Sequence, residues 1–137
     1  MNASFPARPN VVLVVLDSVR RDHLSCYGYH RETTPNIDRL DECGLLFEQA
    51  YSTSCWTIPA HASLFTGLYP SRHGADLELG LDEEHQTLAG YLSAHGYRTA
   101  AISCNGFVSK VTGLDRGFQA SRDVNTLRGA RVPLTCR

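Results

Sequence analysis

Short apolar runs at three places along the chain predict β-strands. The first, Val11–Leu16 (VVLVVL), consists only of valine and leucine, which is typical of a strand buried on both faces. Leu45–Tyr51 (LLFEQAY) and Tyr97–Ser103 (YRTAAIS) predict a second and a third strand.

Apolar residues at helical spacing lie between these runs. Ile37 and Leu40 form the apolar stripe of one expected helix. Thr34 is placed to cap this helix, Pro35 suits its first turn and Gly44 ends it.

Two more helices follow the same signals. A short helix is expected at Ile58–Thr66, closed by Gly67. Another is expected at Thr87–Gly96, where Leu88 and Leu92 lie four positions apart. Strands alternating with helices predict an α/β fold, with a mostly parallel sheet flanked by helices.

The end of the chain has a different pattern. After Phe118 the apolar periodicity is lost and four arginines follow. We therefore expect one domain over residues 1–120 and an irregular, truncated tail over residues 121–137. Since the last readable strand ends at Ser103, the sheet is expected to be incomplete at the C-terminus, with an unpaired edge.

Composition excludes several classes of partner. The 137 residues suffice for one domain, and the net charge of −1 gives no basic surface for nucleic acid or an anionic membrane. The longest apolar run is too short to span a bilayer, and the first ten residues lack the pattern of a secretion signal. The five cysteines form no CxxC pair, so we expect reduced, mostly buried thiols in a cytoplasmic protein.

Asp17 is the first candidate for chemistry, because it directly follows the first predicted strand. Ligands of open parallel sheets collect beyond the carboxyl ends of the strands, so this carboxylate is placed to hold a metal ion or face a phosphate. The alternative is an aspartate that only bonds the backbone of the next turn. A single carboxylate does not bind a divalent cation tightly, so Asp17 needs partners.

The segment CWTIPAHASLFTG (residues 55–67) holds the other candidates. Thr57 precedes the predicted helix, where its hydroxyl either caps the helix or, in the positive potential of the helix terminus, acts as a nucleophile. His61 lies one helical turn further on, where it either binds a tetrahedral anion or protonates a leaving group, or is an ordinary surface histidine. Cys55 has no identifiable base and is expected to be buried, and Ser63 is expected to be structural.

The turn-rich segment GLYPSRHG (residues 67–74) follows. Its Arg72 and His73 either touch an anionic substrate or, as is usual for loop charges, stay solvated.

Several motifs in order, PNVVLVVLDS, TTPNIDRLDECG, TIPAHASLFTG and GLYPSRHG, resemble the N-terminal part of the sulfatase family within the alkaline phosphatase superfamily. The resemblance covers roughly Pro9 to Phe118 and implies an alkaline-phosphatase-like fold. Aligning FTG on the family's Leu-Thr-Gly-like triplet puts Thr57 at the nucleophile position and His61 on the arginine of the motif. Cys55 then falls two positions too early for the cysteine that becomes formylglycine. A threonine nucleophile resembles instead that of phosphoethanolamine transferases and lipoteichoic acid synthases.

The chain also departs from the family pattern at two places. Asp17 matches the first of two adjacent aspartate ligands, whereas Ser18 replaces the second. The family's Gly-Lys-Trp-His element is replaced by SCNG (residues 103–106), where Asn105 is the candidate to take over part of its role. The resemblance thus supports the superfamily more firmly than it supports sulfate as substrate.

The resemblance implies a metal-dependent hydrolase acting on a small anionic sulfate, phosphate or phosphonate ester. Thr57 and His61 are the expected catalytic residues, and Asp17 and Thr57 the expected ligands of a divalent cation, calcium or else manganese or zinc. The family's remaining ligands lie in a later segment, so we expect an N-terminal fragment that is inactive alone. The alternatives are a transferase of the same superfamily and a non-catalytic, degenerate domain; the oligomeric state is open.

Overall fold

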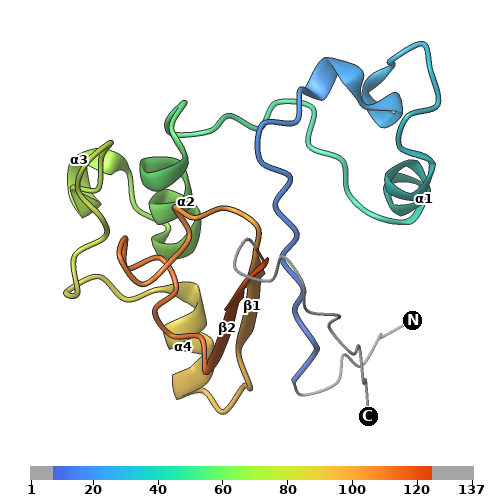
Figure 1. Ribbon diagram of the computed structural model, residues 1–137. Coiled ribbons are helices and arrows are strands. Elements are labelled where there is room, and N and C mark those ends of the chain that lie inside the picture. Colours follow the sequence, from blue (N-terminus) through green and yellow to red (C-terminus); the bar gives the residue numbers. More distant parts are fainter. Residues whose placement is uncertain (1–7, 125–137) are drawn as a thin grey trace. The chain divides into compact units, whose positions relative to one another are not determined.

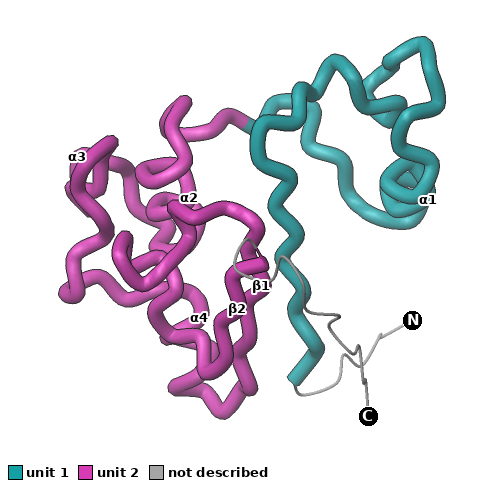
Figure 2. Tube along the Cα trace, viewed as in Figure 1, with its two compact units in different colours: residues 1–50 teal, residues 51–137 magenta. Residues whose placement is uncertain are grey.

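The computed structural model describes residues 8–124. The chain divides into two compact units, unit 1 (residues 1–50) and unit 2 (residues 51–137), which Figure 2 shows in different colours. Each unit is described by itself.

Unit 1 contains two 3-10 turns, η1 (Arg21–His23) and η2 (Ser25–Tyr27), and the helix α1 (Pro35–Cys43). The helix confirms the sequence expectation.

Hydrogen bonds among three polar side chains join η2 to α1. The Asp38 carboxylate accepts from Ser25 Oγ at 2.6 Å and from Thr34 Oγ1 at 3.0 Å. Thr34 is the N-cap residue of α1, as expected, but its side chain makes no capping hydrogen bond to the helix. Its hydroxyl instead accepts from the Ser25 N–H at 3.0 Å. The Ser25 hydrogen bond, more than that of Thr34, lowers the pKa of Asp38 below its ordinary value of 3.8.

The strand predicted at Val11–Leu16 is wrong for this structure. Its residues belong to no helix or strand, and each of the six side chains is at least 43% exposed. The strand predicted at Leu45–Tyr51 is likewise absent. The only sheet within residues 8–124 lies in unit 2, so neither run has the partner strand that would satisfy its backbone and bury its side chains.

Unit 2 carries three helices and two strands in the part that the structure describes (Figure 1). In chain order they are α2 (Thr57–Thr66), α3 (Pro70–His73), α4 (Leu88–Ala94), β1 (Ala100–Ser103) and β2 (Ala120–Asp123). The strands are parallel, with Ala100 opposite Ala120 and Ser103 opposite Asp123. The helices predicted at 58–66 and 87–96 and the strand at 97–103 are confirmed, and the small α/β arrangement agrees with the expected fold class.

β2 corrects the expectation of an irregular segment after Phe118. Its four residues lack the apolar alternation of a strand, and the backbone of β1 supplies the pairing instead. Thr99 holds the segment before β2 next to β1. Its hydroxyl donates to the Gly117 carbonyl at 2.6 Å and accepts from the Gln119 N–H at 3.1 Å. Residues 125–137 of the predicted tail lie outside the described residues.

The core of unit 2 is small and includes one face of α2. Ile58 and Ala62 of this helix cluster with three buried residues from the following segments: Ala75, Leu81 and Leu114. Phe65 and Val108 pack against the cluster from its edge. The packing of α2 therefore decides where the residues at its N-terminal end lie.

No helix in residues 8–124 combines the length and the apolarity that crossing a bilayer requires.

Candidate functional site

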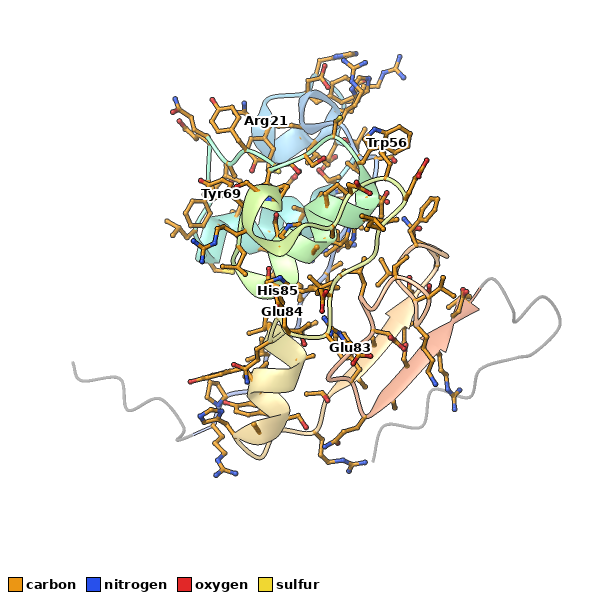
Figure 3. All side chains as sticks on the ribbon, turned by 90° about the vertical axis from the view of Figure 1, so that its left-hand side faces the viewer. Arg21, Trp56, Tyr69, Glu83, Glu84 and His85 are labelled. Atoms are coloured by element: carbon orange, nitrogen blue, oxygen red, sulfur yellow. The ribbon has the colours of Figure 1, made fainter. Side chains whose placement is uncertain are left out.

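Thr57 is the first residue of α2. The N-cap is Trp56, in an extended conformation with φ −108° and ψ 147°, so Thr57 begins the helix rather than preceding it as expected. Trp56 is itself held by a turn, since its N–H donates to Ser54 Oγ at 3.2 Å. The exposed Trp56 side chain is labelled in Figure 3, and Thr57 is half-buried. Sequence reasoning missed Ser54, although a serine two residues before a helix N-cap is a recognisable turn signal.

His61 lies one turn after Thr57, and its ring is hydrogen-bonded to the backbone carbonyl of Thr57. The ring Nδ1 lies 2.9 Å from the Thr57 carbonyl oxygen, which only accepts, so Nδ1 carries the proton and donates to this carbonyl. The imidazole is buried and stands edge-on to Phe65, with the ring centroids 5.9 Å apart. The structure thus places His61 on the Thr57 side of α2, as the i, i+4 spacing predicts.

Cys55 corrects the expectation of buried thiols. It lies exposed in the segment that leads into α2, outside the packed core. Among the other described cysteines, Cys26 is half-buried, whereas Cys43 and Cys104 are exposed.

Asp17 is exposed, at the end of the apolar run in unit 1. The next residue, Ser18, has φ +62°, the only positive φ of a non-glycine residue among those described. Aspartate and asparagine adopt this left-handed conformation more readily than serine does. The backbone at this position therefore suits the aspartate that the family resemblance predicts there.

Substitutions at Ser18 should reveal this backbone strain. Ser18→Asn is expected to stabilise the turn and Ser18→Val to destabilise it, with about 1 kcal/mol between the two variants. Hydrogen exchange at the His23 amide, which donates to the Arg20 carbonyl at 3.1 Å, measures the local opening free energy. Equal exchange in the two variants would contradict a strained Ser18.

Asn105 follows β1, at the end of the strand where ligands of parallel sheets collect. Its backbone closes a turn with Ser103, whose Oγ donates to the Asn105 carbonyl at 2.9 Å. The Asn105 side-chain oxygen accepts from the Phe107 N–H at 3.0 Å, which orients the amide. The role in substrate binding suggested for Asn105 stays a prediction.

The donor atoms of Asp17 and Thr57 are carboxylate and hydroxyl oxygens, which suit hard divalent cations. Within residues 8–124, no three His, Cys, Asp or Glu side chains gather closely enough to hold a metal ion. The two predicted ligands belong to different units, and their pairing stays a prediction.

Comparisons with known proteins concern most of the chain. The family described as Sulfatase matches residues 9–131. An N-acetylgalactosamine-6-O-sulfatase of Bacteroides thetaiotaomicron is 35% identical over 107 residues, covering 74% of this chain and 21% of that protein. Human arylsulfatase A is 38% identical over 98 residues, covering 66% of this chain and 19% of its own length. The chain thus spans about a fifth of the length of these relatives.

A solved structure shares the fold. The phosphonate monoester hydrolase of Agrobacterium radiobacter superposes with a TM-score of 0.66 at 30% sequence identity, covering 82% of this chain and 25% of that one. This likeness agrees with the alkaline-phosphatase-like fold expected from the sequence. Because the family match extends over far more than half of its residues, the chain belongs to the sulfatase family.

Proposed function

We propose that this chain carries the nucleophile of a metal-dependent ester hydrolase, and that Thr57 is that nucleophile. The substrate class is a small anionic sulfate, phosphate or phosphonate ester. The observation that carries the proposal is the position of Thr57 at the first residue of α2, with His61 bonded to it one turn on. Sulfatase relatives and a phosphonate monoester hydrolase as structural neighbour support this chemistry.

The position of Thr57 at the N-terminus of a helix favours a reaction in which negative charge develops at its hydroxyl and on the ester. α2 is ten residues long, and its first turn presents the positive end of the helix dipole. Such a terminus stabilises a nearby negative charge by about 0.3–1 kcal/mol in exposed settings. An oxyanion of the ester and the developing alkoxide of Thr57 would both benefit.

His61 is proposed to protonate the leaving group. Since its Nδ1–H is engaged with the Thr57 carbonyl, Nε2 is the ring nitrogen left to face the ester. In the imidazolium form Nε2–H can bond an oxygen of the ester and protonate the departing alkoxide. As the bond from Thr57 Oγ to phosphorus or sulfur forms, the hydroxyl proton of Thr57 passes to solvent and the bond to the ester oxygen breaks. Water later hydrolyses the threonine ester and returns a proton to Thr57 Oγ.

A divalent cation is part of the proposal. Asp17 and Thr57 are the residues of this chain proposed to hold it, with further ligands supplied from beyond residues 8–124. A bound cation would lower the pKa of a coordinated hydroxyl and neutralise charge on the ester.

A substrate panel tests the proposed function in the full-length product of the gene. We expect hydrolysis of at least one of four substrates, an aryl sulfate, a phosphate monoester, a phosphate diester and a phosphonate monoester, with loss of activity on chelation and recovery on adding a divalent cation. Absence of hydrolysis across the panel, after loading with calcium, manganese and zinc in turn, would favour a non-catalytic domain.

A further inference from the structure

A buried serine–histidine pair joins α2 to α3. Ser63 Oγ and His73 Nε2 lie 2.9 Å apart, and the two residues are 7% and 2% exposed. His73 is the last residue of α3, in the segment where a solvated loop histidine was expected. Neither residue has a part in the proposed ester cleavage.

The backbone beyond α3 determines which ring nitrogen of His73 carries the proton. The Ala75 N–H donates to His73 Nδ1 at 3.1 Å, and a backbone N–H can only donate. Nδ1 is therefore the unprotonated nitrogen of the neutral ring. Nε2–H consequently donates to Ser63 Oγ.

This direction of donation excludes the catalytic interpretation of the pair. A general base must accept the serine proton at the nitrogen that faces the hydroxyl, whereas here that nitrogen already carries a proton.

The contacts of His73 instead hold α2 at several points. The ring contacts α2 through Ser63, whose Oγ lies 2.9 Å from His73 Nε2. Ser63 lies one turn after the first turn of α2. On its other side, the ring fixes Ala75, which packs in the core cluster with Ile58 and Ala62 of the same helix.

We propose that His73, in its neutral Nε2–H form, is a positioning residue that holds the first turns of α2, and with them Thr57 and His61, and that protonation of His73 releases this hold. Protonation would place a second N–H at Nδ1, directly opposite the Ala75 N–H, and the hydrogen bond between them would be lost. The effect of His73 on catalysis rests on the proposed function, whereas the protonation state of His73 and its hydrogen bond to Ser63 do not.

The surroundings of His73 favour the neutral ring. Burial is the largest cause that lowers the pKa of His73 below its ordinary value of 6.5, and the nearby His85 lowers it further. The backbone carbonyls of Pro59 and of His73 itself act in the opposite direction but do not outweigh these causes. His85 comes from the segment before α4, where its Nε2 lies 3.4 Å from a carboxylate oxygen of Glu84; both residues are labelled in Figure 3.

The sign of the pH effect follows from this lowered pKa. Between the folded pKa and 6.5 the unfolded chain binds a proton at His73 that the folded chain does not. The contribution to stability is therefore complete above pH 6.5 and is lost as the pH falls through 6.5 towards the folded pKa.

Two substitutions divide the functions of the ring. In His73→Gln, the side-chain amide can donate to Ser63 from the place of Nε2 and does not titrate, but it offers no acceptor to Ala75. In His73→Asn, the side-chain oxygen can accept from Ala75 at the place of Nδ1, but the side chain does not reach Ser63. His95→Gln is the matched control, because His95 is exposed and its Nδ1 donates to the Tyr91 carbonyl at the end of α4.

The experiment combines nitrogen-15 NMR of the His73 ring, unfolding as a function of pH, and hydrogen exchange at the Ala60 amide, which donates to the Trp56 carbonyl at 3.1 Å. We expect a protonated Nε2, an unprotonated Nδ1 and a His73 pKa below 6.5. His73→Gln should remove the loss of stability below pH 6.5 that the wild type and His95→Gln share. Above pH 6.5, His73→Asn loses the Ser63 bond, and His73→Gln loses the Ala75 bond as the protonated ring does. Each variant should therefore accelerate Ala60 exchange about tenfold or more, whereas His95→Gln should leave it unchanged.

Three results would contradict the proposed role of His73. A protonated Nδ1, a His73 pKa above 6.5, or unchanged Ala60 exchange in His73→Asn would overturn the proposal. For a full-length protein that hydrolyses an ester, kcat should fall about tenfold or more in His73→Asn and in His73→Gln with little change in KM, and should stay near the wild-type value in His95→Gln. If no ester is hydrolysed, the proposed function fails, and the NMR and exchange results still decide the role of the pair.

Discussion

Thr57→Val is expected to lower the kcat of the full-length enzyme at least about a thousandfold, a loss of about 4 kcal/mol of transition-state stabilisation. Valine keeps the shape of threonine but removes the oxygen that would form the covalent bond. Thr57 is only half-buried and begins α2 without capping it, so the substitution should leave the thermal unfolding midpoint within a few degrees of wild type. Hydrolysis kinetics on the best substrate of the panel, together with a melting curve, measure both effects.

Cys55→Ala is the matched control two positions earlier. Cys55 is an exposed free thiol, so its loss should leave kcat within about twofold of wild type. The opposite pair of results, an active Thr57→Val and an inactive Cys55→Ala, would restore the formylglycine interpretation of this segment.

Gly117→Ala is expected to destabilise unit 2 by more than about 3 kcal/mol. A Cβ at this position would stand 2.6 Å from the Gly90 Cα and 2.7 Å from the Ala89 carbonyl carbon, and it would overlap the Gly90 nitrogen. These are backbone atoms of α4, so a side chain cannot move aside to relieve the overlap. The φ of +86° at Gly117 adds strain of its own for any residue with a Cβ.

Gly106→Ala tests whether this effect is specific to position 117. Gly106 lies in the same connection between β1 and β2, and a Cβ there would meet nothing within 4 Å. Its free energy of unfolding in urea should stay within about 0.5 kcal/mol of wild type. Similar losses in the two variants would contradict the close approach of Gly117 to α4.

The helices were predictable because their signals are local. α2 follows from a short apolar pattern closed by Gly67, and the structure gives this glycine φ +72° at the helix end. The i, i+4 placement of His61 relative to Thr57 follows from the same helix geometry.

The strands show where local signals fail. Val11–Leu16 has the composition of a buried strand, but burial requires a partner that the described residues do not provide. β2 has no strand pattern at all, and its pairing depends on long-range bonds of Thr99 to Gly117 and Gln119. Propensity therefore misses it.

The buried pair escaped prediction for a related reason. In the sequence, His73 is one of several polar residues of a turn-rich segment. A single sequence does not show that its ring accepts a hydrogen bond from Ala75, which packs in the core. Its partner Ser63 lies ten positions earlier, on a different element. Only the packing of α3 on α2 brings the two together.

The covalent state of Thr57 during turnover can be measured directly by mass spectrometry of the tryptic peptide spanning residues 40–72, which contains both Cys55 and Thr57 and is bounded by arginines. In full-length enzyme quenched during hydrolysis, fragmentation should locate a phosphoryl, phosphonyl or sulfuryl group on Thr57, with Cys55 as an unmodified thiol. An aldehyde at Cys55, or the transferred group on a residue other than Thr57, would contradict threonine as the nucleophile.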